Sequence, residues 1–211
     1  MPSGDLPGGM RLQDAQDRLV ALASTQHGVF GARQIVGTGV TAQHLEHLVR
    51  RRVIVRVGPQ AYRFAGVPPS WHGDLAAGLH ALGPTGCVSH RAAARLHGFD
   101  RFVYDDPEFT VRRRRRGAFF LDAVIHTSLV LPASDIVTVD GLATTSPVRT
   151  IIDLAAVRIR DERLEAAVDS ALRLRLATLD AIVERLGQLR GKGRAGVRRL
   201  DRVLVTSGGH S

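Results

Sequence analysis

The chain has 211 residues, a formal net charge of +9 and a pI of about 11.2, and 44% of its residues are hydrophobic. This length and composition allow one large or two small globular domains, and the charge favours a polyanion, nucleic acid first, as partner. The single cysteine, Cys87, excludes an intramolecular disulfide and a cysteine-based zinc site, and no apolar run reaches the length of a membrane span.

Residues 1–11 form a Gly/Pro-rich stretch without the charged and apolar regions of a signal peptide, so we expect a disordered tail on a cytoplasmic protein. Apolar residues then recur at helical spacing from Leu12 to Ala23, which predicts an amphipathic first helix that Gly28 ends. Residues 32–36 predict a second, short helix, and Gly37-Thr38-Gly39 predicts the turn that follows it.

The segment from Thr41 to Phe64 predicts a third helix followed by a basic hairpin. Thr41 is a plausible N-cap, and Leu45, Leu48 and Val49 give the helix one buried face, while Glu46 is expected on a different side from the polar histidines. The periodicity then changes to that of two strands joined by a turn at residues 58–60. Five arginines and no acid lie between Arg50 and Arg63.

Helix, short helix, turn, helix and hairpin is the order of a winged helix-turn-helix. In such a domain the last helix enters a major groove and the hairpin lies on the adjacent backbone. The alternative is a small helical core whose arginines are merely solvated. We predict a DNA-binding domain over residues 12–66, with these residues at the interface: Thr41, Gln43, His44, His47, Arg50, Arg51, Arg52, Arg56, Gln60 and Arg63.

A stiff linker, Val67-Pro68-Pro69-Ser70, precedes a second segment that we assign to residues 71–205. Its pattern mixes strands and helices, so the fold class predicted for the chain is α+β: an N-terminal winged helix-turn-helix and a mixed α+β C-terminal domain. Helices are expected at 71–82, 89–96, 148–156, 164–174 and 179–186, and strands at 108–112, 123–126 and 136–139. Asp140-Gly141 is expected to turn the chain after the last strand, and Ser146 and Pro147 are expected to be the N-cap and first residue of the helix that follows. Residues 197–205 follow a basic glycine loop at 191–196. Residues 206–211 are either a loose tail or a linker to a further domain.

The run Arg112, Arg113, Arg114, Arg115 and Arg116 lies between two expected strands. It is interpreted either as a solvated hairpin loop or as a second basic patch that contacts phosphates or an acidic partner. A further basic stretch at residues 190–202 is interpreted either as a third patch that contacts the DNA backbone or as a linker that precedes a further domain.

Three segments resemble one known family. They are residues 28–64, VSHRAAARLHGF at 88–99 and DGLATTSPVRTIIDLAA at 140–156, which are spread between residues 28 and 156 of the chain. The chain resembles the AbiEi-type antitoxins of type IV toxin–antitoxin systems, in their actinobacterial branch. The resemblance implies a DNA-binding repressor of its own operator, and a nucleotidyltransferase-like toxin as a second partner. Where the family often has glycine after the arginines that end the third helix, this chain has Arg52-Val53.

The residues that suggest catalysis or metal binding have simpler explanations. His44 and His47 are three apart, but no third ligand has suitable spacing, so we expect no metal and no cofactor. Ser89 and His90 are adjacent and are not expected to face each other, and Asp105-Asp106-Pro107-Glu108 lacks the lysine of a metal nuclease.

Arg149 and Asp153, four apart on one helix, are expected to tie this helix to a neighbouring segment or to contact the toxin. The chain as a whole is therefore interpreted as a non-enzymatic regulator that binds double-stranded operator DNA and acts as an antitoxin. Two alternatives remain: a targeting fragment of a larger DNA-processing protein whose nuclease-like domain is absent here, and a pure protein-interaction module.

Overall fold

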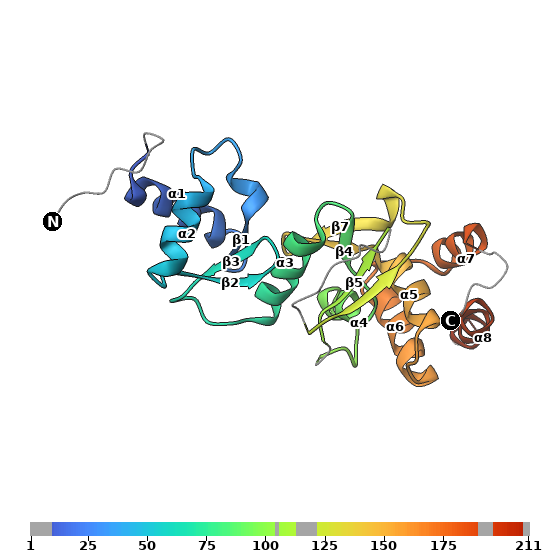
Figure 1. Ribbon diagram of the computed structural model, residues 1–211. Coiled ribbons are helices and arrows are strands. Elements are labelled where there is room, and N and C mark those ends of the chain that lie inside the picture. The colour runs from blue at the N-terminus through green and yellow to red at the C-terminus, as the bar shows by residue number, and fades with distance from the viewer. Residues whose placement is uncertain (1–9, 104–105, 113–121, 190–195, 209–211) are drawn as a thin grey trace. The chain divides into compact units, whose positions relative to one another are not determined.

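The computed structural model describes residues 10–103, 106–112, 122–189 and 196–208 (Figure 1). The described residues up to Thr85 form one unit, and most of those from Gly86 onward form another. Each unit combines helices with a sheet, so the predicted α+β class is confirmed. No helix within these ranges is both long and apolar enough to cross a membrane.

The first unit begins with a helix, a strand, a short helix, a helix and a hairpin, in the predicted order. Its three strands form an antiparallel sheet in the order β1-β3-β2. Only the second helix differs in kind, because it is a single 3-10 turn. The elements are α1 (Leu12–Ser24), β1 (Val29–Gly31), the 3-10 helix η1 (Ala32–Ile35), α2 (Ala42–Arg50), β2 (Ile54–Gly58) and β3 (Ala61–Phe64).

One face of this sheet carries the core of the unit. Phe30, Ile54 and Tyr62 pack with Leu19 of α1 and Leu48 of α2 in one buried apolar cluster. Successive side chains of a strand point to opposite faces, so Val29, Gly31 and Arg63 belong to the other face.

Helix α3 (Trp71–Leu82) covers that second face. It contacts all three strands, and a Cβ atom at Gly31 would lie only 2.5 Å from Nδ1 of His80. Glycine at position 31 is therefore what allows β1 and α3 to approach so closely. Residues 71–82, expected in the second segment, contact the sheet of the first unit in the structure, and the two units divide after Thr85.

The second unit is built on a five-stranded mixed sheet in the order β6-β5-β4-β8-β7. Cys87 lies on the central strand and is fully buried. Asp140 and Gly141 form the predicted turn between the last two strands, and both have positive φ, +48° and +76°. The strands are β4 (Gly86–Val88), β5 (Glu108–Val111), β6 (Val124–Thr127), β7 (Ile136–Val139) and β8 (Leu142–Thr145).

Strands β5 and β6 are parallel, pairing Phe109 with Ile125 and Thr110 with His126. The interpretation of Arg112–Arg116 as a hairpin loop is therefore wrong, because a hairpin joins antiparallel strands and parallel neighbours need a longer connection. Arg112 is exposed, while Arg113, Arg114, Arg115 and Arg116 lie outside the described residues.

Helices α4 to α8 supply most of the core of the second unit. Leu154 of α5, Leu164 of α6 and Leu186 of α7 are buried in one cluster with Leu200 of α8. Helix α5 begins as predicted, because the Ser146 hydroxyl accepts from the Arg149 amide and Pro147 is the first helical residue. The helices are α4 (His90–Leu96), the 3-10 turn η2 (Ala133–Asp135), α5 (Pro147–Ala156), α6 (Asp161–Arg173), α7 (Leu179–Gln188) and α8 (Val197–Gly208).

The predicted tails are only partly described. Met10 and Arg11 precede α1, and residues 206–208, expected in the loose C-terminal tail, are the last residues of α8. Residues 1–9 and 209–211 lie outside the described residues.

Candidate nucleic-acid interface

Helix α2 begins with a reciprocal cap between Thr41 and His44. The Thr41 hydroxyl accepts from the His44 amide at 3.2 Å, and the Thr41 amide donates to Nδ1 of His44 at 3.0 Å. The histidine thus does what glutamate or glutamine does in a capping box. His44 is only 1% exposed, so the expectation that its side chain lies on the outer face of the helix is wrong.

The outer face of α2 carries Gln43, Glu46 and Arg50, which are all exposed, with His47 partly buried beside them. Residues three and four apart share a helix face, so Glu46 lies on the same face as Gln43 and Arg50. Glu46 is absent from the interface predicted from the sequence, although its spacing of three from Gln43 and four from Arg50 indicates this shared face.

A hollow of about 560 Å³ lies between α2 and the β2–β3 hairpin. Arg56 is held at this hollow by its own strand pair, because its Nη2 donates to the Tyr62 hydroxyl at 2.9 Å and its guanidinium lies 5.5 Å from the Tyr62 ring centre. The lining residues are Ala32, Ile35, Ala42, Leu45, Glu46, Val49, Arg50, Arg56, Gln60 and Tyr62. Helix and hairpin therefore present polar groups to one shared concave surface.

The predicted hairpin arginines do not all share this surface. Arg63 is next to Tyr62 on β3, so its side chain lies on the α3 face of the sheet. Burial raises the pKa of Asp74 on α3, and the positive charge of Arg63 opposes that rise. Arg63 thus interacts electrostatically with α3, on the face of the sheet opposite the hollow.

The junction between α2 and β2 contains Arg52 in a left-handed backbone conformation, with φ of +56°. This is the region that glycine occupies without a steric penalty and other residues adopt at a cost. The position is the one at which the resembling family often has glycine. Arg51 and Arg52 are both exposed there, beside Arg50 at the helix end.

In the second unit, Arg149 is buried and each nitrogen of its guanidinium group donates a hydrogen bond. It is 1% exposed, and its Nε donates to Asp153 Oδ1 at 2.8 Å, while Nη1 donates to Asp135 Oδ2 at 2.7 Å. Further bonds reach the Val130 carbonyl and the Ser128 hydroxyl. Arg185 of α7 binds the same Asp135 carboxylate. Arg149 thus joins α5 to the segment 128–135 and, through Asp135, to α7.

Ser89 and His90 lie in contact, which the sequence analysis did not expect. Nδ1 of His90 is 2.9 Å from the Ser89 hydroxyl, which also accepts from the Thr110 hydroxyl at 2.8 Å. Ser89 occupies the N-cap position of α4 but makes no side-chain cap bond. Its side chain is fully buried, so a substrate has no access to this hydroxyl, and the geometry favours a packing role over a nucleophile.

Glu108 lies at the centre of a buried charged cluster with Arg91, His90 and His126. Arg91 donates to both Glu108 oxygens, and His126 Nε2 donates to Oε1 at 2.6 Å. Burial alone would raise the pKa of Glu108, but the bonds from His126 and Arg91 lower it to about 2. Burial, followed by the charge of His126, lowers the pKa of His90 to about 3.

The two histidines and Glu108 are close enough to suggest metal ligands. However, the His90 and His126 rings stack face to face with centres 3.6 Å apart, so their in-plane lone pairs do not converge on one point. Both carboxylate oxygens of Glu108 already accept bonds from a cation. This arrangement favours a hydrogen-bonded ion pair over a metal centre.

Comparison with known proteins bears on the first unit. Residues 17–65 match the model of a family described as transcriptional regulator, AbiEi antitoxin. The match runs from within α1 to just beyond β3, and it therefore includes α2, the hairpin and the hollow between them. No curated protein matches the chain.

Proposed function

We propose that the first unit binds double-stranded DNA as a winged helix, with α2 in the major groove and the β2–β3 hairpin on the adjacent backbone. The observation that carries this proposal is the hollow that α2 and the hairpin share, with Glu46, Arg50, Arg56 and Gln60 around it. Support comes from the element order, which is that of winged helix-turn-helix domains, and from the match of residues 17–65 to a transcriptional regulator family.

The proposed division of roles follows the chemistry of each side chain. Gln43 and Glu46 face outward near the start of α2, where an amide pairs with adenine and a carboxylate accepts from the cytosine amino group. The exposed residues Arg50, Arg51, Arg52 and Arg56, with Gln60 in the hairpin turn, hold phosphates. His44 and Thr41 serve the helix cap, and His47 lies at the edge of the interface. Because Arg63 lies on the α3 face, we leave it out of the interface.

Arg56→Gln and Arg63→Gln form a matched test of this interface. Both substitutions remove one positive charge from the same hairpin, but from opposite faces of its sheet. Arg56→Gln is expected to weaken binding to all duplexes and to lower the slope of log K against log salt by about one unit. Arg63→Gln is expected to leave that slope near the parent value. Equal slopes for the two variants, measured by fluorescence anisotropy with a labelled duplex, would overturn the assignment.

We infer further that the whole chain acts without catalysis, as an AbiEi-type antitoxin of the actinobacterial branch that represses its own operator in the cytoplasm. Its second partner would be a nucleotidyltransferase-like toxin. The support is the antitoxin description of the family that matches residues 17–65. Co-expression with the product of an adjacent nucleotidyltransferase gene tests it, and the expected result is restored growth. Unrestored growth with a toxin of proven activity refutes the antitoxin role and leaves DNA binding unaffected.

A further inference from the structure

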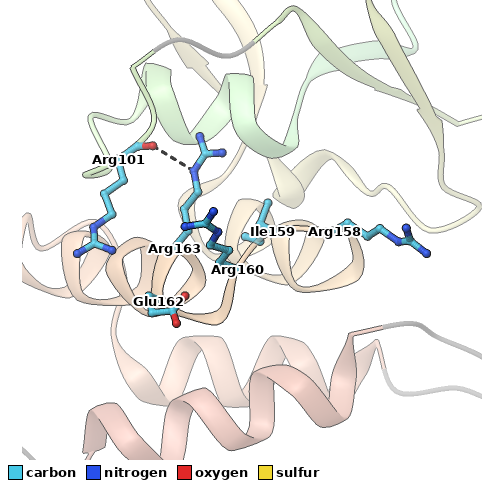
Figure 2. Close-up of a pocket in the computed structure, with 6 residues that line it drawn as sticks. All are labelled: Arg101, Arg158, Ile159, Arg160, Glu162 and Arg163. Atoms are coloured by element: carbon cyan, nitrogen blue, oxygen red, sulfur yellow. Dashed lines mark hydrogen bonds between the residues drawn. The ribbon is translucent and has the colours of Figure 1, made fainter.

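A second arginine-lined hollow lies in the second unit, beside the start of α6 (Figure 2). Its volume is about 760 Å³. Four of its lining residues are arginines and one is an acid, so the surface carries a strong positive charge. The lining residues are Arg101, Arg158, Ile159, Arg160, Glu162 and Arg163.

The segment that carries Arg158 and Arg160 is fixed in place by Arg199 of α8. Nη1 of Arg199 donates to the Val157 carbonyl at 3.0 Å, Nη2 donates to the Ile159 carbonyl, and Nε pairs with Asp161 at 2.6 Å. One guanidinium thus binds two carbonyls of the connection between α5 and α6 and the first residue of α6. The two hollow-lining arginines therefore project from an ordered backbone.

The backbone at Arg101 is also held in an unusual conformation. Its φ is +70°, a left-handed value that is costly for a residue with a side chain. The preceding residue, Asp100, is tied to α6 because its amide and carboxylate both bind the Ser170 hydroxyl, and Arg173 donates to the same carboxylate at 2.7 Å. Strained residues that are held by their surroundings are concentrated at binding sites.

Arg163 completes the arrangement by linking the two segments. Its Nε donates to the Arg101 carbonyl at 3.1 Å, and its guanidinium lies 4.2 Å from the centre of the Phe102 ring. Figure 2 shows the side chain of Arg158 directed away from those of Arg101, Arg160 and Arg163. The guanidinium groups of Arg158 and Arg160 hydrogen-bond to no group in the described part of the chain. Four positive charges and one negative charge therefore line this hollow.

We propose that this hollow binds the phosphate backbone of a nucleic acid, as a surface separate from α2 and the hairpin. Guanidinium groups match phosphate oxygens in geometry, and arginine is the usual residue for such contacts. The arginines diverge along the surface instead of converging on one point, which suits successive phosphates of a strand better than one compact anion. Ile159 is the single apolar residue of the lining, whereas a pocket for a mononucleotide is lined mainly by apolar and aromatic groups.

The test compares two double variants of the full chain that lose the same charge. Arg158→Gln/Arg160→Gln changes the hollow, and Arg173→Gln/Arg175→Gln changes exposed arginines of the same unit that do not line it. Anisotropy of a labelled random-sequence duplex is measured between 50 and 200 mM salt. The hollow variant is expected to bind roughly tenfold more weakly at the lower salt and to lose about two units of salt slope, near 0.9 for each phosphate contact. The control variant is expected to stay close to the parent.

Equal behaviour of the two double variants overturns the proposal. To separate this proposal from the proposed winged-helix function, both double variants are also measured in a protein that carries Arg56→Gln. If the two surfaces bind DNA independently, the losses in log K from Arg56→Gln and from the hollow variant should add. The hollow variant should also leave the sequence preference unchanged, because α2 is proposed to read the bases. A further arm replaces the duplex with labelled polyglutamate. Loss of polyglutamate binding with unchanged duplex binding would make the hollow an acidic-polypeptide site and would refute the nucleic-acid assignment.

Discussion

Arg149 and Asp153 lie one turn apart on α5 and form a 2.8 Å ion pair in the interior of the second unit. Cation before acid is the weaker order for an isolated helix pair. Here the pair does not act alone, because Arg149 also binds Asp135, Ser128 and the Val130 carbonyl. The side chain therefore connects elements that are distant in sequence, which gives it a structural role whatever partner the unit binds.

Arg149→Ala is expected to destabilise the second unit by about 3–5 kcal/mol, because two carboxylates stay buried after their shared cation is removed. Arg173→Ala is the control, since its pair with Asp100 is 59% exposed on both sides and solvent screens such a pair, so this variant is expected to unfold like the parent. Urea denaturation of the full chain compares them. An Arg149→Ala protein that unfolds like the parent but no longer neutralises a toxin would make this pair a contact site.

The stability of the second unit is expected to fall as the pH falls below about 6.5. The pKa of His90 is lowered from 6.5 to about 3, so the unfolded chain binds a proton in this range and the folded chain does not. The pKa of Glu108 is lowered from 4.5 to about 2, so this group causes a second loss of stability as the pH falls below 4.5. Each group contributes at most about 1.4 kcal/mol per pH unit.

His90→Asn isolates the histidine contribution to this profile. His90 has a φ of +52°, and asparagine tolerates that conformation better than most residues. The variant is expected to show a shallower loss of stability between pH 6.5 and 4.5, with the loss below 4.5 retained. An unchanged slope in urea midpoints over the upper interval would mean that His90 is not the titrating group.

Arg52→Gly is expected to raise stability and weaken DNA binding at the same time. Glycine relieves the left-handed strain at φ +56°, a gain of roughly 1 kcal/mol, while one proposed phosphate contact is lost. Arg51→Gly is the control, because Arg51 has a φ of −80° and glycine there costs about 0.5–1 kcal/mol. Thermal melting and the salt slope measure the two effects, and a destabilised Arg52→Gly protein would contradict the strain argument.

Gln43→Ala and Glu46→Ala are expected to change which sequences are bound. Each should reduce discrimination at one base pair by about 1–3 kcal/mol, at adenine for Gln43 and at cytosine for Glu46. His44→Ala should instead weaken binding to every duplex alike, because it loosens the helix cap. Selection from a random duplex pool distinguishes these results. Identical selected sequences for the parent and both outer-face variants would exclude base reading by α2.

Gly31→Ala is expected to destabilise the first unit by about 1–3 kcal/mol, because the new methyl group meets the His80 ring. His80→Ala removes that ring, so the double variant should recover part of the loss. The two effects should then be non-additive in a double-mutant cycle. Strict additivity in thermal unfolding would show that α3 does not pack on β1 in solution.

Local signals in the sequence predicted much of the fold. Helical spacing predicted α1 from Leu12 and α3 from Trp71, and Ser146-Pro147 predicted the start of α5. These features depend on residues a few positions apart. The parallel pairing of β5 with β6 was not predictable in that way, because strand pairing depends on contacts between distant segments.

The candidate site shows the same limit. The polar face of α2 and the basic hairpin were visible in the residue pattern, whereas the burial of His44 depends on a cap that forms only in three dimensions. The position of Arg63 depends on strand alternation and on α3 covering that face. Likewise, Arg158 and Arg160 reach the same hollow as Arg101 through the packing of α6, about sixty residues later in the chain.

The Cys87 thiol is the only one in the chain. It is fully buried on the central strand of the second sheet, and burial raises its pKa to about 12. Alkylating reagents attack the thiolate. The folded sheet keeps the reagent away from the sulfur, and the raised pKa keeps the thiol protonated. When the sheet recloses faster than iodoacetamide reacts, the modification rate of the untreated protein is proportional to the fraction of molecules in which the sheet is open. The natural thiol thus reports local unfolding of the second unit without an introduced label.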